Sequence, residues 1–242
     1  MTRRQRLPYK YTVRLSVVSR AVPAGSTRDR VYAVLREAIV SAELRPGRQL
    51  SENELSDLIG VSRTPVREAL IRLRDERLVA IVPQLGTFVT LISPEAVADA
   101  AFVREALECS AVRLAAERCT PDDLGALQAN LVAQERAQAA GEADAFDRLD
   151  DELHRMLCDL SGHEVAWELS RRANGHLDRV RRLSLPEPAY RGEMLGEHRE
   201  VIAAVARGDA DAAERTLRHH LRMVPSHLPH IRDAHPEFFG DD

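Results

Sequence analysis

Four side chains in the second half of the chain have the types and spacing of a metal-binding site. Asp150 and His154 are four residues apart, so on a helix they project from neighbouring turns. His198 and His220 each lie in the middle of an apolar helical stripe. At about 1.5 Å of rise per residue, two antiparallel helices that turn near Gly208 bring these two imidazoles to nearly the same height. One carboxylate and three neutral imidazoles suit zinc, with nickel or manganese as alternatives.

The other histidines and the cysteines suggest simpler roles. An inward histidine is more often a hydrogen-bonded core residue than a ligand, but two at matched height beside an Asp/His pair favour a shared site. His219 points off the apolar face and is excluded. The remaining histidines are expected at the surface: His163, His176, His227, His230 and His235. Three cysteines without a close pair exclude a disulfide framework and a cysteine-based zinc site.

Residues 93–226 have the pattern of amphipathic helices that would position these side chains. Ser93 and Thr120 are caps followed by proline, and glycines mark several helix ends. We predict an antiparallel all-α bundle of about six helices, near residues 94–118, 121–140, 143–161, 164–183, 190–207 and 209–225. Residues 227–242 are expected to form a poorly ordered tail.

Charge divides the chain into two unequal parts. Residues 1–92 carry 16 lysines and arginines against 9 acidic residues, whereas residues 93–242 carry 18 against 29. A basic head on an acidic body suggests that only the head binds a polyanion, although chance clustering of solvated charges is the alternative. Residues 1–26 have no helical or strand period and are predicted to be a basic flexible arm.

Length and composition exclude several classes of protein. The chain has 242 residues, of which 44% are apolar and 30% charged, so it can bury a core and form two domains. No stretch approaches the roughly 18 apolar residues of a membrane span, and the segment Leu15–Ala24 is too polar for a signal peptide. We therefore expect a cytoplasmic protein without membrane contact.

Residues 27–92 have the pattern of a winged helix. A helix is expected from residue 27 to a point before Pro46. A second should span about 52–59 behind a capping box that begins at Ser51, and a third should span 62–76 after a turn at Gly60. This is helix-turn-helix spacing. Two β-branched runs at 78–82 and 87–91, joined by a turn that contains Gly86, predict a hairpin.

The second helix of a helix-turn-helix enters the DNA major groove by its N-terminus, which here presents Ser62, Arg63, Thr64 and Arg67. Arg63 suits a bidentate contact to guanine and Arg67 a second base or a phosphate, while the two hydroxyl residues suit phosphates. Gly86, which has no side chain, would let the hairpin turn approach the adjacent minor groove. Solvated arginines on an exposed helix are the alternative.

The head also carries a recognisable motif. The segments Leu50–Glu52, Leu55–Leu70 and Leu78–Val79, with Leu73, closely resemble the winged-helix head of the GntR family of bacterial transcription regulators. Many relatives have an arginine DNA contact where this chain has Asn53, which is expected to contact DNA in its place. Many relatives also have wing-tip arginines where this chain has Gln84 and Leu85. These departures predict weaker phosphate binding at those points or a different base preference.

The body resembles the FCD ligand-binding domain of the FadR branch of that family. Its motifs occur in order over about residues 94–222: Arg104 with Glu108, Asp150-x-x-Leu153-His154, Ser161-Gly162, Glu197-His198 and the closing segment 217–221. The resemblance implies a metal-containing bundle in which a small organic or sugar acid completes the coordination of the metal. It further implies that Arg104 holds the carboxylate of that effector, with a surface ion pair as the alternative.

Together these patterns predict a homodimeric, sequence-specific transcription repressor that binds double-stranded operator DNA and responds to a carboxylate at its metal site. Repression rests on the family resemblance, whereas dimerisation rests on that resemblance and on the need to read paired half-sites. The chain is not expected to be an enzyme, because no general base or nucleophile motif accompanies the ligands. Two alternatives stay open: a metal-responsive regulator without an organic effector, and a metal-dependent hydrolase with a DNA-binding head.

Overall fold

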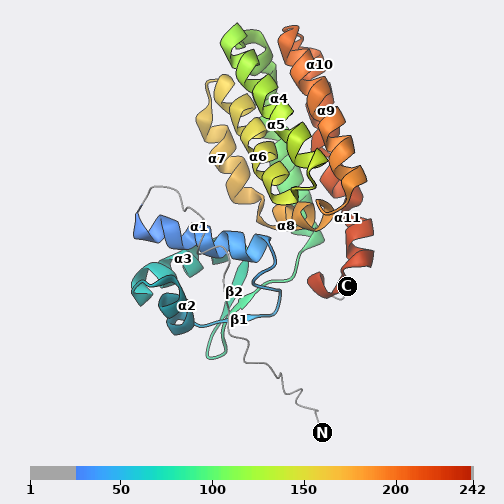
Figure 1. Cartoon of the computed structure of the whole chain (residues 1–242). Helices are drawn as coiled ribbons and strands as arrows, with labels where there is room; N and C mark the ends of the chain where they lie inside the picture. The colour runs from blue at the N-terminus through green and yellow to red at the C-terminus, as the bar shows by residue number, and fades with distance from the viewer. Residues whose placement is uncertain (1–25, 241–242) are drawn as a thin grey trace.

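A computed structural model describes residues 26–240 as a winged-helix head beneath a larger helical body (Figure 1). The predicted basic arm, except for Ser26, lies outside the described residues. Over the described range, no helix is long and apolar enough to cross a membrane.

Three helices and a three-stranded antiparallel sheet make up the head. The helices are α1 (Thr27–Val40), α2 (Glu52–Ile59) and α3 (Arg63–Asp75), and the strands are β1 (Gln49–Leu50), β2 (Val79–Val82) and β3 (Gly86–Val89), in the order β1-β3-β2. The Ser51 side chain caps α2 by accepting from the Glu54 amide, and Gly60 ends that helix in the left-handed conformation at φ 76°. The predicted winged helix is confirmed.

Apolar stripes on α1 and α3 form the core of the head. Leu35 and Ile39 of α1 meet Val66, Leu70 and Leu73 of α3, and each of these side chains is at most 2% exposed. Burying branched side chains on one face of each helix is the main stabilising term in so small a unit. This packing leaves the opposite face of α3 toward solvent.

The body consists of eight α-helices, where about six were predicted. They are α4 (Pro94–Arg118), α5 (Pro121–Ala139), α6 (Ala143–Leu160), α7 (Glu164–Ala173), α8 (Gly175–Ser184), α9 (Pro188–Ala206), α10 (Ala210–Leu221) and α11 (Met223–Ala234). The helix starts at Ser93 and Thr120 are confirmed, the second as a full capping box with Asp123. Helix α4 packs against α6, α7, α9 and α10, and so runs through the middle of the bundle.

The first extra helix arises because the predicted segment 164–183 is divided at Asn174. Helix α7 ends at Ala173, and α8 then crosses the end of the bundle that faces the head (Figure 1). A Cβ on Gly175 would lie only 3.0 Å from the side chain of Leu78 in the head. The glycine therefore permits a close approach between α8 and the head that a helical periodicity does not reveal.

The second extra helix corrects the prediction of a poorly ordered tail. Helix α11 is followed by the 3-10 helix η2 (Pro236–Phe238), and Ile231, Phe238 and Phe239 are buried against the body. Phe239 also forms a β-bridge with Ile92, in the linker between head and body. The apolar burial of these side chains outweighs the helix-breaking tendency of the prolines in this segment.

Polar contacts fix the head on the body. Arg36 of α1 donates to Asp178 of α8 at 2.7 Å and to the Arg171 carbonyl at 3.3 Å. His176, which was expected at the surface, is only 4% exposed. Its Nδ1 accepts from the Ser93 amide at 3.1 Å, and its Nε2 lies 3.0 Å from the Arg77 carbonyl. This histidine joins the linker to the head because α8 carries it into the interface.

Candidate functional site

The exposed N-terminal turns of α3 carry four of the six residues predicted to contact DNA. Ser62, Arg63, Thr64 and Arg67 are all solvent-exposed, as a DNA-contacting helix requires. Ser62 stands at the N-cap position, but its side chain makes no capping hydrogen bond. A hydroxyl that does not cap its own helix stays available to a phosphate.

Two of these residues are linked to α2. Arg63 donates to the Asn53 side chain at 3.3 Å, so Asn53 lies beside the predicted DNA-contacting surface. Arg67 makes a bidentate pair with Glu52, at 3.0 and 2.8 Å. This hydrogen-bonded pair lowers the pKa of Glu52 despite slight desolvation, and it occupies the guanidinium of Arg67.

The wing is the β2–β3 hairpin, and Gly86 is essential to its shape. Gly86 has a φ of +122°, which side-chain-bearing residues rarely adopt. A Cβ at this position would also lie 2.7 Å from Gln49 Nε2, which donates to the Leu85 carbonyl. The glycine thus has a structural reason for its presence that is independent of any contact with DNA.

The four predicted ligands meet inside the body. Helix α6 supplies Asp150 and His154, α9 supplies His198 and α10 supplies His220. All four side chains are at most 4% exposed, and their ligand atoms lie within 4.8 Å of one another. His220 Nε2 is 3.1 Å from His154 Nε2 and 3.3 Å from His198 Nε2, and His198 Nε2 is 3.1 Å from Asp150 Oδ1.

A second layer of oxygen atoms orients the three imidazoles. Nδ1 of His198 lies 2.7 Å from Gln134 Oε1, and Nδ1 of His220 lies 2.9 Å from Glu197 Oε2. Nδ1 of His154 lies 2.7 Å from Glu108 Oε2. An amide oxygen or carboxylate accepts hydrogen bonds, so the proton of each neutral ring belongs on Nδ1 and the lone pair on Nε2.

With the protons on Nδ1, no hydrogen atom lies between the closely spaced Nε2 and Oδ1 atoms of the cluster. Their short contacts are therefore not hydrogen bonds. Three Nε2 lone pairs and Asp150 Oδ1 then face one point, and among the described residues Asp150 Oδ1 has no hydrogen-bond donor. Buried acceptors facing one another repel, and a divalent cation removes the repulsion. The arrangement can therefore hold a metal ion.

Electrostatics favour the neutral forms of His198 and His220 and the ionised form of Asp150. Burial, followed by repulsion from His198 and His154, holds the pKa of His220 well below its ordinary value, and burial likewise lowers the pKa of His198. Burial opposes ionisation of Asp150, but attraction to Arg181 leads the effects that hold its pKa well below the ordinary value. These are the charge states in which both residue types bind metals.

Arg104 lies next to this cluster but is already paired. It is 3% exposed and donates to Glu108 through Nε at 2.8 Å and Nη2 at 3.4 Å. The Glu108 side chain also contacts His154, and its Oε1 accepts from Ser170 at 2.8 Å. The ion pair considered for Arg104 is therefore present, although it is buried rather than at the surface.

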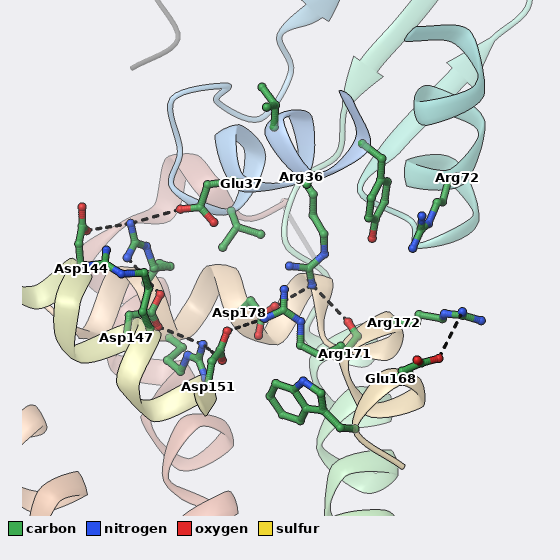
Figure 2. Close-up of a pocket in the computed structure, with 18 residues that line it drawn as sticks. Arg36, Glu37, Arg72, Asp144, Asp147, Asp151, Glu168, Arg171, Arg172 and Asp178 are labelled. Atoms are coloured by element: carbon green, nitrogen blue, oxygen red, sulfur yellow. Dashed lines mark hydrogen bonds and ion pairs between the residues drawn. The ribbon is translucent and has the colours of Figure 1, made fainter. Parts of the chain in front are cut away.

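A cleft of about 700 Å³ lies between the head and the body. Figure 2 shows Arg36 reaching from α1 toward Asp178, with Asp147 and Asp151 on the body side. Arg181 connects this cleft to the buried cluster, because it donates to Asp151 at 2.6 Å and to Asp150 at 2.7 Å. Asp150 is thus linked through Arg181 to the cleft below the head.

Sequence reasoning missed the residues that support the cluster. Gln134 is fully buried on α5 and Arg181 lies on α8, so neither shares a helix with a ligand. A polar residue within an apolar stripe was the available signal for Gln134, and adjacency to His198 was the signal for Glu197. Arg181 carried no such signal, since it is one of three arginines in the short segment 179–182.

Comparison with known proteins agrees with this two-part architecture. Residues 27–89 match the model of the bacterial regulatory proteins of the gntR family, and residues 99–223 match the FCD domain. An HTH-type transcriptional regulator in an unstable DNA locus of Streptomyces ambofaciens is 42% identical, over 90% of this chain and 91% of that protein. The HTH-type transcriptional repressor RspR of Escherichia coli is 32% identical, over 94% of this chain and all of RspR.

A solved structure shows the same fold. Escherichia coli McbR/YncC superposes with a TM-score of 0.75 over 88% of this chain and all of that chain, at 22% identity. A winged helix joined to an FCD body defines a class of bacterial transcription regulators. This chain belongs to the GntR family, in the branch that carries an FCD domain.

Proposed function

We propose that this regulator is a repressor that binds double-stranded operator DNA as a homodimer and releases it when a small organic or sugar acid binds at a metal ion in the body. The metal ligands in this proposal are Asp150, His154, His198 and His220, and the ion is zinc, with nickel or manganese as alternatives. RspR, which aligns over nearly the whole chain, is described as a repressor, and this supports repression rather than activation.

The observation that carries the proposal is the orientation of the three imidazoles. Each Nδ1 faces an oxygen acceptor on a different residue, Glu108, Gln134 or Glu197, so every Nε2 is left to bind a cation. Four ligands about 2.0–2.1 Å from a tetrahedral zinc ion lie about 3.3 Å apart. Three separations in the cluster are 3.1, 3.3 and 3.1 Å, close to this value, and His154 Nε2 lies 3.7 Å from Asp150 Oδ1.

A bound metal would supply a Lewis acid to which a carboxylate can bind. Arg104 is the protein's own cation for that carboxylate, because it interacts electrostatically with Asp150, His198 and His220. Glu108 already occupies the guanidinium, so an effector would have to share Arg104 or displace Glu108.

A chain of ion pairs offers a route from this site to the head. Arg181 binds the ligand Asp150 on one side and Asp151 on the other, and Asp151 binds Arg171 at 2.5 Å. The Arg171 carbonyl then accepts from Arg36 of the head helix α1. An effector that alters Asp150 can bias the placement of the head through these contacts, provided that the two placements differ in affinity for DNA.

Dimerisation has a candidate surface on two helices that pack together. Phe102 of α4 is 75% exposed, and Val165 and Leu169 of α7 are 57% and 46% exposed. Exposed large apolar side chains on two helices that pack together offer apolar area to a protein interface. A second copy of the chain is the partner in this proposal, because the reading of paired half-sites requires two heads.

Thermal melting of the zinc-loaded protein against a panel of small carboxylates tests the proposal. A ligand at a hundred times its Kd adds about 2.7 kcal/mol of stability, which gives a clear rise in Tm. The rise should vanish when His198 and His220 are replaced by alanine. If no carboxylate changes the Tm while zinc still does, the metal-responsive alternative is favoured. Turnover of any substrate would instead favour the hydrolase alternative.

A further inference from the structure

A second group of metal-binding side chains lies outside the buried cluster. Glu187 stands at the N-cap position of α9, and His227 and His230 lie one turn apart on α11. His227 Nε2 is 3.7 Å from Glu187 Oε2, and His230 Nε2 is 3.3 Å from Glu187 Oε1. One ligand atom from each of the three residues lies within 4.8 Å of the other two.

The surroundings of His227 differ from those of an ordinary surface histidine. Its ring packs against Tyr190 with a centroid separation of 4.8 Å, and its Nε2 is shielded from solvent. Within residues 26–240, this buried Nε2 has no hydrogen-bond partner. This shielded nitrogen lies beside a carboxylate and a second imidazole, so it has the surroundings of a metal-binding atom.

The helix that carries the two histidines is intrinsically weak. Pro229 lies between them, inside α11, and lacks the amide that would donate to the carbonyl of Pro225. Its inward-facing side chains Val224 and Ile231 hold the helix on the body. An ion bound by His227 and His230 would span the turn weakened by Pro229 and attach it to the start of α9.

We infer that Glu187, His227 and His230 form a second divalent-metal site, for zinc or another imidazole-binding ion such as nickel. Two imidazoles and one carboxylate leave the remaining coordination positions to water, which suits a half-exposed site. The site shares no residue with the buried cluster and does not depend on the proposed function.

The location of this site gives the ion a structural role. From α11 the chain continues through η2 to Phe239, which bridges to Ile92 in the linker between head and body. The Ile92 amide also donates to the Phe238 carbonyl at 2.8 Å. A metal at His227 and His230 would therefore anchor the segment that covers the linker.

Zinc stoichiometry of the tag-free, full-length protein tests this inference. After equilibration at micromolar free zinc, we expect two zinc ions per chain in the wild type and one in the His227→Ala/His230→Ala variant. His230→Ala alone should have the same effect, and because this side chain is 61% exposed, its loss leaves the fold intact. His163 is exposed and belongs to neither cluster, so the His163→Ala variant should still bind two zinc ions.

The two sites are separated by a second pair of variants. His198→Ala/His220→Ala should retain one zinc ion, and adding His230→Ala should abolish binding. Zinc should also slow hydrogen exchange of the α11 amides in the wild type but not in His230→Ala. The inference is overturned if His230→Ala binds as much zinc as the wild type, whereas loss of the buried ion alone would count only against the proposed function.

Discussion

Arg181 Nη1 donates to Asp150 Oδ2 at 2.7 Å, while Asp150 Oδ1, the other oxygen of this carboxylate, faces the three imidazoles. One carboxylate thus belongs both to the buried cluster and to the ion pairs beneath the head. Arg181 also contacts Asp147 at 3.0 Å and Asp151 at 2.6 Å, so a single buried guanidinium contacts three carboxylates. This residue connects the site to the interface physically.

Replacing Arg181 by methionine should destabilise the protein by about 3–5 kcal/mol, because buried carboxylates lose their counter-ion. Asp147, whose pKa burial already raises to about 6, would then be protonated at neutral pH. Urea denaturation at pH 7 measures the loss. Arg199→Met, which removes an exposed arginine paired with Glu135, should cost less than about 1 kcal/mol. Equal losses in the two variants would contradict the role given to Arg181.

Gln134→Met should lower zinc affinity by about 10–100-fold, because the Nδ1 proton of His198 loses its acceptor and the ring loses its orientation. Competition with a chromophoric chelator gives the affinity. Gln128→Met on the exposed face of the same helix is the matched control and should leave the affinity unchanged. An unchanged affinity in Gln134→Met would mean that the second layer does not support the site.

The sequence predicted that these four side chains meet, because helical spacing constrains their positions. Asp150 and His154 share one helix, and the turn at Gly208 brings His198 and His220 to matching heights, as the structure confirms. Residues that act across helices were not predictable in this way. Gln134 and Arg181 reach the cluster only through tertiary packing, which periodicity along one helix does not encode.

The misplaced elements have a similar explanation. Gly175 allows α8 to approach Leu78 of the head, and this contact between distant residues turns one predicted helix into two. His176 was assigned to the surface because it lies near a helix end, yet the same contact buries it. In α11 the prolines argued against a helix, and the apolar residues Ile231 and Phe238 become buried only against the folded body.

Arg63→Ala and Arg67→Ala should each weaken binding to DNA selected by the protein from a random pool by about tenfold or more. If Arg67 contacts a phosphate, its loss should also reduce the salt dependence of log K by about one. Fluorescence anisotropy over a salt series provides both numbers. Arg74→Ala, at the far end of α3, should leave affinity and slope unchanged. Wild-type affinity in both variants would show that these arginines of α3 do not contact DNA.

His176 should make the stability of the protein depend on pH. Burial lowers its pKa to about 4, below the ordinary value near 6.5, so the folded state binds fewer protons than the unfolded chain between these values. Its contribution is complete above pH 6.5 and falls as the pH drops toward 4, by about 3 kcal/mol. Denaturation of the wild type and His176→Gln at pH 7 and pH 4.5 should show their difference shrinking. A constant difference would show that His176 is not held neutral.

The most direct test of the account is the affinity of the zinc-loaded protein for its selected DNA, measured with and without a carboxylate that raises the Tm. We predict that the carboxylate weakens DNA binding by at least about tenfold, the lower range of ordinary allosteric coupling. The same addition should leave the DNA affinity of His198→Ala/His220→Ala unchanged. An equal response in that variant, or unchanged affinity in the wild type with the carboxylate bound, would contradict the claim that the buried cluster controls the head.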